Sequence, residues 1–153
     1  MVSKIIGAFI IFAAVASCAA PKQSTFGYNQ SLADSLGADD YGMRNYQFVI
    51  LKTGPSKIAD KDSINKLFRG HMENIGRLAD EGKLVVAGPF GKNDKQYRGL
   101  FIFKTDKVET ENLLQTDPAI KAGLLDVEMY PWYGSAALPM YLQYHKQIEK
   151  SKP

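Results

Sequence analysis

Hydrophobic and polar positions follow two different periods along the chain, and the change of period predicts where strands and helices lie. The run YQFVIL, residues 46–51, has almost no polar alternation, which is typical of a strand covered on both faces. The Gly-Pro pair at 54–55 ends it. A helical stripe follows, made of Ile64, Leu67, Phe68, His71, Ile75 and Leu78. We expect Asp62 or Ser63 to cap this helix and Gly82 to end it.

The second half of the chain predicts three more strands and one more helix. Two of the strands are KLVVAGPF, residues 83–90, and LFIFK, residues 100–104, with a polar loop between them. Asp106 and Glu109 then have the spacing of a capping box, which predicts the start of a helix. Its inward-facing positions are expected to be Val108, Leu113 and Leu114. The segment LLDVEMYPW, residues 124–132, supplies the last strand.

The element order is therefore β-α-β-β-α-β over residues 45–134, which predicts an α+β domain with the ferredoxin-like fold. Both crossovers share one hand, so both helices are expected on the same face of the sheet. The opposite face is uncovered in a monomer and is expected to be partly apolar, with Phe48, Val86 and Phe103 among its residues. Such a face favours a partner, and the simplest partner is a second copy of the chain in a homodimer.

The segment after the domain, residues 135–153, predicts an additional helix. Pro139 suits the first turn of a helix. One stripe of this helix contains Leu138, Tyr141, Leu142, His145 and Ile148. We expect the extension to dock on the body of the domain or on a partner subunit.

The first residues carry the pattern of an export signal. Lys4 precedes an uncharged apolar run, residues 5–16, which is shorter than the roughly 20 residues of a membrane-spanning helix. Residues 1–17 are therefore predicted to be a secretory signal peptide. The sequence Val-Ala-Ser-Cys that ends at Cys18 resembles the bacterial lipobox, which implies a lipidated cysteine at the start of the mature protein. A free thiol or an intermolecular disulfide is the alternative for this single cysteine.

Residues 18–44 are rich in Gly, Ser, Asp and Asn and lack a sustained period. This composition predicts a flexible tether between the lipid and the folded domain. Together with Cys18, it predicts an exported protein that is anchored by its lipid in the cell envelope, at the periplasm or the outer membrane.

Composition limits the classes of function. The chain is 45% hydrophobic and 23% charged, as in an ordinary folded domain, and its net charge of +3 creates no strong field to attract nucleic acid. Two histidines far apart and one cysteine do not make a metal-binding set. The sequence has no G-x-S-x-G, phosphate-binding glycine loop or dinucleotide motif. We therefore expect no metal, no cofactor and no nucleic-acid partner.

Three stretches, in order and at suitable spacing, carry a family resemblance. They are HMENIGRLADEGKLVVAGPF, residues 71–90, TDPAIKAGL, residues 116–124, and YPW, residues 130–132. Over residues 44–134 the chain resembles the YCII-related (YciI-like) family. The resemblance implies a dimeric ferredoxin-like α/β barrel, in agreement with the element order, and an acid/base dyad of His and Asp. Most members have no assigned reaction, although the family includes a dehydrochlorinase.

The family's histidine falls on His71, and two aspartates compete to be its partner. Asp80 lies nine residues further along the same helix, so it points to about the opposite face and does not reach the imidazole. Asp117 follows the second helix, which the fold sets beside the first. The dyad is therefore carried onto His71 and Asp117. An imidazole oriented by a carboxylate is a general base near neutral pH, suited to removing a proton next to a carbonyl group.

These residues also have purely structural interpretations. His71 lies in an apolar stripe, where a histidine is commonly a core residue satisfied by a backbone carbonyl. Asp117 precedes Pro118, and Asp-Pro is a common helix start with Asp as the N-cap. Arg69 and Arg77 suit either an anionic ligand or a solvated helix flank.

Four further residues are candidates for ligand binding. Gly88, Pro89 and Phe90 form a pocket wall if the glycine lets backbone N–H groups approach a ligand, or simply a turn that ends the strand. Trp132, with its neighbour Tyr133, lines a binding site or makes core or dimer contacts.

Together these features predict a lipid-anchored protein with cofactor-free acid/base activity, of isomerase or lyase type, on a small organic molecule. The alternative is a non-catalytic ligand-binding or envelope protein-interaction module. A hydrogen bond between His71 and Asp117 at the floor of a cleft favours the first. An imidazole enclosed by Leu and Phe side chains favours the second.

Overall fold

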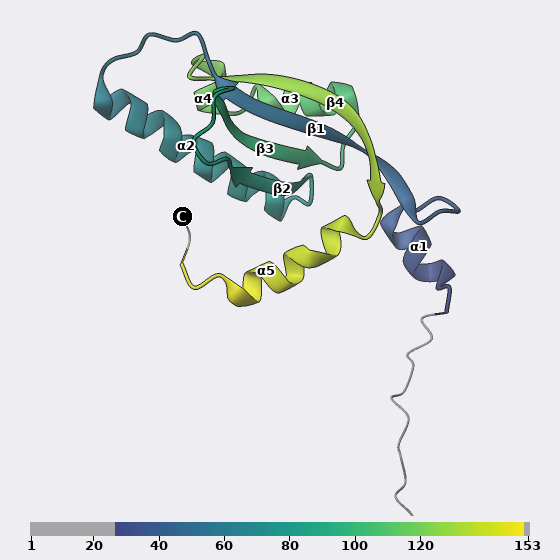
Figure 1. Ribbon diagram of the computed structural model, residues 1–153. Coiled ribbons are helices and arrows are strands. Elements are labelled where there is room, and N and C mark those ends of the chain that lie inside the picture. The colour runs from purple at the N-terminus through teal and green to yellow at the C-terminus, as the bar shows by residue number, and fades with distance from the viewer. Residues whose placement is uncertain (1–26, 152–153) are drawn as a thin grey trace, which may run out of the picture.

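The computed structural model describes residues 27–151 and shows one four-stranded antiparallel sheet with helices packed against it (Figure 1). The strands are β1 (Met43–Thr53), β2 (Leu84–Pro89), β3 (Tyr97–Phe103) and β4 (Leu125–Ser135). The helices are α1 (Gln30–Leu36), α2 (Lys61–Asp80), α3 (Lys107–Leu114), α4 (Pro118–Lys121), the 3₁₀ helix η1 (Leu138–Tyr141) and α5 (Leu142–Ile148). The sheet order β2-β3-β1-β4, with one crossover through α2 and one through α3 and α4, confirms the predicted α+β ferredoxin-like fold.

The main core lies between the sheet and helices α2, α3 and α4. Residues that pair across strands point to the same face, and Val49 pairs with Phe101 while Gln47 pairs with Phe103. This face buries Val49, Leu51, Leu84, Phe101, Phe103 and Leu125 against Leu78, Leu113, Leu114 and Ala119 of the helices. The prediction that Phe103 lies on the uncovered face is therefore wrong. The run LFIF is apolar at every position, so its pattern does not indicate which residues face the helices.

Helix α2 begins earlier than the sequence indicates. Its N-cap is Asp60, whose carboxylate accepts the backbone N–H of Ser63 at 2.9 Å, so the prediction of a cap at Asp62 or Ser63 is wrong. The predicted end is correct. Gly82 adopts a φ of 67° and donates to the carbonyl of Ala79, while Lys83 donates to the carbonyl of Leu78, which together form a Schellman motif.

Helix α3 has the predicted N-cap, but one residue that is predicted to face inward is exposed. Asp106 accepts the backbone N–H of Glu109 at 2.8 Å, as a capping residue does. Val108 is 66% exposed, so the prediction that it faces inward is wrong. Thr110 takes the buried position instead, because residues 110, 113 and 114 share one face of a helix whereas 108 lies off it.

The segment that the sequence favours as a tether contains the short helix α1. It buries no residue, which explains why no apolar stripe indicates it, and Gly37 ends it at positive φ. Arg44 of β1 donates to the carbonyl of Leu36 at 2.9 Å, and the hydroxyl of Tyr133 donates to the Asp39 carboxylate. That hydrogen bond holds the pKa of Asp39 below its usual value. Polar contacts, rather than apolar packing, therefore attach this segment to the domain.

The second face of the sheet is partly covered by the chain's own C-terminal segment. Tyr46, Val85 and Ile102 are buried there with Leu138 of η1 packed against them, and the Tyr141 hydroxyl donates to the carbonyl of Val85. The expected docking on the body of the domain is thus made by η1. The following helix α5 has no buried residue, and its Tyr144 and Ile148 are exposed, so most of its apolar stripe lies away from the core.

Part of this second face stays uncovered. Tyr130 and Trp132 of β4 are exposed on it, and Phe48 of β1 is half-buried. Phe48 pairs with Tyr130, which places the two rings on the same open face.

Residues 27–151 contain no helix that combines the length and the apolarity needed to cross a bilayer. The predicted signal peptide, residues 1–17, and the predicted lipidation site Cys18 lie outside the described residues. Export and lipidation therefore stay predictions.

Candidate active site

His71 lies near the middle of α2, on the face turned towards the sheet. Its ring stacks on Phe101 of β3 with 5.9 Å between the ring centroids, and it meets the ring of Phe68 edge-on at 6.1 Å. The residue is 7% exposed. The two aromatic contacts hold the plane of the imidazole and thereby fix the directions of its two nitrogen atoms.

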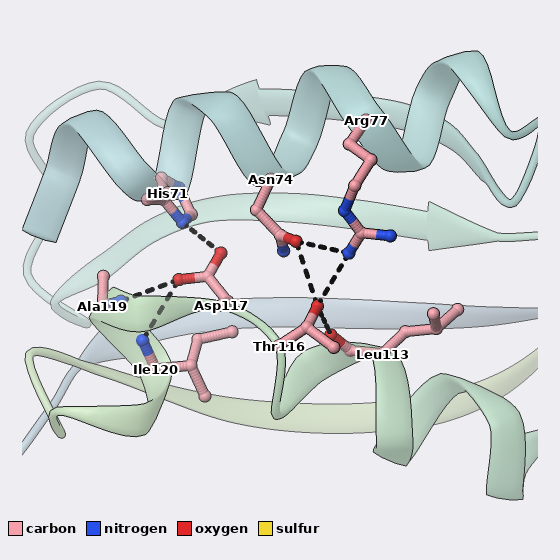
Figure 2. A network of polar contacts seen from close by, with 8 residues as sticks. All are labelled: His71, Asn74, Arg77, Leu113, Thr116, Asp117, Ala119 and Ile120. Atoms are coloured by element: carbon pink, nitrogen blue, oxygen red, sulfur yellow. Dashed lines mark hydrogen bonds and ion pairs between the residues drawn. The ribbon is translucent and has the colours of Figure 1, made fainter.

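Asp117 approaches His71 from the connection between α3 and α4 (Figure 2). Its Oδ2 lies 2.6 Å from His71 Nδ1, and its Oδ1 accepts the backbone N–H groups of Ala119 at 2.9 Å and Ile120 at 3.2 Å. The residue is 1% exposed. The prediction that folding brings His71 and Asp117 into contact is confirmed. Asp117 is also the N-cap of α4, so it caps this helix and contacts His71 at the same time.

The contacts of Asp117 indicate which imidazole nitrogen carries a proton. Because the carboxylate accepts N–H groups on both oxygens, Nδ1 of His71 acts as a donor to it. In a neutral imidazole, Nε2 then keeps a free lone pair. Within residues 27–151, Nε2 has no hydrogen-bond partner, and it is not sealed from solvent, because Arg44 Nε is the one buried and unpartnered side-chain N or O atom there. The pair is therefore an oriented imidazole whose Nε2 is unpartnered and not completely buried.

A glycine permits the close approach of the two helices that makes this contact. Gly70 precedes His71, and a Cβ atom at Gly70 would lie 2.7 Å from Cγ of Pro118, the first residue of α4. Carbon atoms of different residues do not pack that closely. Only a glycine here lets α4 come near enough to α2 for Asp117 to reach the imidazole.

Gly70→Ala is therefore expected to lower the free energy of unfolding, even though alanine favours a helix over glycine by about 1 kcal/mol. The new methyl group meets the Pro118 ring and pushes Asp117 away from His71. Gly76→Ala in the same helix is the matched control, because nothing lies within 4 Å of its added Cβ, and we expect it to stabilise by about 0.5–1 kcal/mol. Urea unfolding measures both variants. Equal stabilisation by the two would contradict the packing argument.

A polar network beside the pair joins α2 to the same connection (Figure 2). Arg77 donates to Asn74 Oδ1 at 2.7 Å, to Thr116 Oγ1 at 3.0 Å and to Glu81 Oε1 at 2.7 Å. Arg77 is thus engaged by neighbouring side chains of the domain. Asn74 and Thr116 were not singled out in the sequence. The one signal for Asn74 is its spacing of three residues from His71, which places both on one helix face.

The four predicted ligand-binding residues lie outside this arrangement. Trp132 pairs with Tyr46, and their rings are 5.5 Å apart, on the sheet face opposite the one that His71 covers. Gly88 and Pro89 end β2, and the ring of Phe90 lies 6.3 Å from that of Tyr97. In the described part of the chain, no hydrogen bond or ring contact joins these four residues to the pair. Their role in ligand binding stays a prediction.

Neither of two hollows in the described surface is lined by His71 or Asp117. Arg44, Gln47, Lys104 and Tyr133 are among the residues that line the larger one, and the smaller one lies between α3 and β4. The cleft expected beside His71 and Asp117 is thus not one of these hollows. Within residues 27–151, no group of three or more His, Cys, Asp and Glu side chains is arranged to hold a metal ion.

The structure thus defines a ferredoxin-like domain with a buried, hydrogen-bonded pair of His and Asp. No protein-family model and no curated protein matches the chain. Among solved structures, the chain is similar to 5-chloro-2-hydroxyhydroquinone dehydrochlorinase (TftG) from Burkholderia phenoliruptrix AC1100 in complex with 2,5-dihydroxybenzoquinone. The identity is 23%, the match covers 57% of this chain and 92% of that chain, and the TM-score is 0.42.

Proposed function

We propose that the chain is a cofactor-free acid/base catalyst, of isomerase or lyase type, that acts on a small organic molecule. The observation that carries the proposal is the contact of 2.6 Å between His71 Nδ1 and Asp117 Oδ2, in which both residues are buried. His71 accepts and returns the proton at Nε2, and Asp117 orients the ring.

The geometry supports a two-step reaction. Nε2 takes a proton from a carbon next to a carbonyl group, and the electron pair of the broken C–H bond moves into an enolate. The Asp117 carboxylate stabilises the imidazolium through Nδ1–H. The proton then goes to another atom of the enolate, which gives isomerisation, or to a group that leaves the adjacent carbon, which gives elimination. A base of this kind contributes about 10²–10⁴ in rate.

Deuterium exchange tests the proposal. The full chain is incubated in D₂O with a panel of cyclic ketones and hydroxyquinones, and mass spectrometry follows the incorporation of deuterium. We expect at least one compound to exchange about 10²–10⁴-fold faster with the wild type than with His71→Gln. His145→Gln is the matched control, because His145 is the other histidine and is exposed. It should behave as the wild type.

Two outcomes of that experiment count against catalysis. Equal exchange of every compound by the wild type and by His71→Gln contradicts the role of the imidazole. A large fall in the unfolding temperature of His71→Gln, with no effect on exchange, indicates a core residue instead.

We propose further that the chain is a YCII-related protein and forms a homodimer through its uncovered sheet face. The element order and the His and Asp pair support the family. The exposed Tyr130 and Trp132 beside the half-buried Phe48 support the dimer, because such apolar surface is commonly covered by a partner. Analytical ultracentrifugation of the soluble part, residues 27–153, measures its mass. A monomer at all concentrations contradicts the dimer.

Export and lipid anchoring are also proposals. The support is the sequence pattern of residues 1–17 and the lipobox resemblance that ends at Cys18. Mass spectrometry of the mature N-terminus from a bacterial host should find a diacylglyceryl group on Cys18, and Cys18→Ser should remove it and release the protein from the envelope. An intact N-terminus, or an unmodified cysteine, contradicts this proposal.

Two observations favour the alternative, a non-catalytic ligand-binding or envelope protein-interaction module. His71 is 7% exposed and its ring lies against Phe68 and Phe101, as in an enclosed core histidine. Helix α5 leaves Tyr144 and Ile148 exposed, as a helix that contacts another protein would. The exchange experiment separates the two. Binding of a panel compound without any exchange favours the module.

A further inference from the structure

Asn74 lies beside His71 and is nearly as well buried. It is 9% exposed and follows His71 by three residues, so both side chains leave α2 on the face that meets Asp117 and Thr116 (Figure 2). Most polar side chains buried to this degree use all of their hydrogen-bonding groups. Asn74 uses only its carbonyl oxygen, and its N–H₂ group has no partner among the described residues.

The orientation of the Asn74 amide is decided by its neighbour. The guanidinium of Arg77 has only donors, so the atom of Asn74 that lies 2.7 Å from Arg77 Nη2 must be the carbonyl oxygen. Thr116 Oγ1 lies 3.0 Å from the same oxygen, and Arg77 is itself held by Glu81. The single hydroxyl proton of Thr116 is shared with the carbonyl of Leu113 at 2.7 Å, so the Arg77 guanidinium is the group that fixes Oδ1. The N–H₂ group therefore points the other way and cannot exchange places with the oxygen at low cost.

That N–H₂ group has no acceptor in the described part of the chain. It is also not sealed from solvent, because Arg44 Nε is the one side-chain N or O atom there that is both buried and unpartnered. His71 Nε2 meets the same two conditions. Two residues on one helix face, about one turn apart, thus leave an unpartnered acceptor, Nε2, and an unpartnered donor, the Asn74 amide.

We propose that Asn74 is a substrate-binding residue whose amide donates a hydrogen bond to a carbonyl oxygen, while His71 removes the proton from the adjacent carbon. This inference rests on the proposed function and adds the residue that binds the carbonyl oxygen of its substrate. The negative charge that develops on the oxygen strengthens the hydrogen bond, so the amide stabilises the enolate more than the substrate. The Arg77 guanidinium polarises the same amide through Oδ1, which makes its N–H groups better donors.

4-Nitrophenolate is a suitable probe, because its oxygen carries a delocalised negative charge on a planar carbon as an enolate does. The ¹⁵N-labelled full chain is titrated with it, and NMR follows the side-chain signals of Asn74 and His71. We expect both signals to shift. Asn74→Ala should weaken binding roughly tenfold to a hundredfold, as expected for the loss of one hydrogen bond to a charged group. Asn65→Ala is the matched control on the same helix, where Asn65 is exposed, and should bind as the wild type does.

The other outcomes separate this inference from the proposed function. If His71 responds while the Asn74 amide does not, and Asn74→Ala binds the probe unchanged, Asn74 only links α2 to the α3–α4 connection and the inference is wrong. The proposed function then stands. If the signals of neither residue shift, the site does not bind an enolate-like oxygen. That result contradicts both the role of Asn74 and the proposed function. Circular dichroism of each variant confirms that it is folded.

Discussion

Asp117→Ala is expected to lower the free energy of unfolding by about 2–4 kcal/mol, as the sum of two losses. Helix α4 loses its N-cap, which typically costs about 1 kcal/mol. The Nδ1–H of His71 also loses its acceptor, and a buried group left without a partner costs about 1–3 kcal/mol. Urea unfolding of the full chain measures the change.

Asp117→Asn is the control that separates the cap from the base. Its Oδ1 still accepts the backbone N–H groups at the start of α4, so we expect a loss of only about 1–2 kcal/mol. Its N–H₂ group, however, faces His71 Nδ1 and turns that nitrogen into an acceptor. The proton of the neutral imidazole then sits on Nε2, which can no longer take one from a substrate.

The two variants therefore separate the two roles of Asp117. Stability reports the helix cap, and exchange in D₂O reports the orientation of the imidazole. Asp117→Asn should remain folded while exchange in D₂O falls nearly as far as in His71→Gln, and ¹⁵N NMR should show the proton of His71 on Nε2. A cost below about 1 kcal/mol for Asp117→Ala would mean that the described contacts contribute little to stability. Full exchange by Asp117→Asn would mean that Asp117 acts as a helix cap alone.

Much of this site was predictable because each residue carries a local signal. His71 occupies an apolar stripe, and Asp117 precedes a proline at a helix start. The family resemblance supplied the pairing of the two, which helix geometry narrowed by excluding Asp80. Asp80 in fact lies 3.0 Å from Lys146 Nζ of α5. Gly70 and Asn74 were not predictable in the same way, because their importance depends on contacts with Pro118 and Arg77 that only the folded chain creates.

The fold was predictable from the spacing of hydrophobic residues along the chain. The prediction fails where that spacing carries no information. The helical stripe and the capping residue Asp106 follow from side chains that repeat or bond locally. Helix α1 has no buried side chain, so a hydrophobic pattern does not indicate it. The prediction for Phe103 of β3 is wrong, because strand faces are fixed by the register with the neighbouring strand and not by the apolar run itself.

Phe103→Ala is expected to lower the free energy of unfolding by about 3–5 kcal/mol, because the ring is completely buried between the sheet and the helices and leaves a cavity that the neighbouring side chains do not fill. Phe48→Ala is the matched control from the other face of the sheet. Its ring is half-buried, so the loss should be only about 1–2 kcal/mol when the protein is dilute.

The comparison of these two variants also tests the proposed dimer. If a second copy of the chain covers Phe48, stability of the wild type rises with protein concentration, and Phe48→Ala reduces that dependence. Phe103→Ala should lower stability by the same amount at every concentration within the dimeric range, because its ring faces the core of one subunit. Urea unfolding at two protein concentrations measures the stability of the wild type and of both variants. An equal, concentration-independent loss for both variants would contradict the assignment of an open face to the sheet, and with it the surface on which the dimer depends.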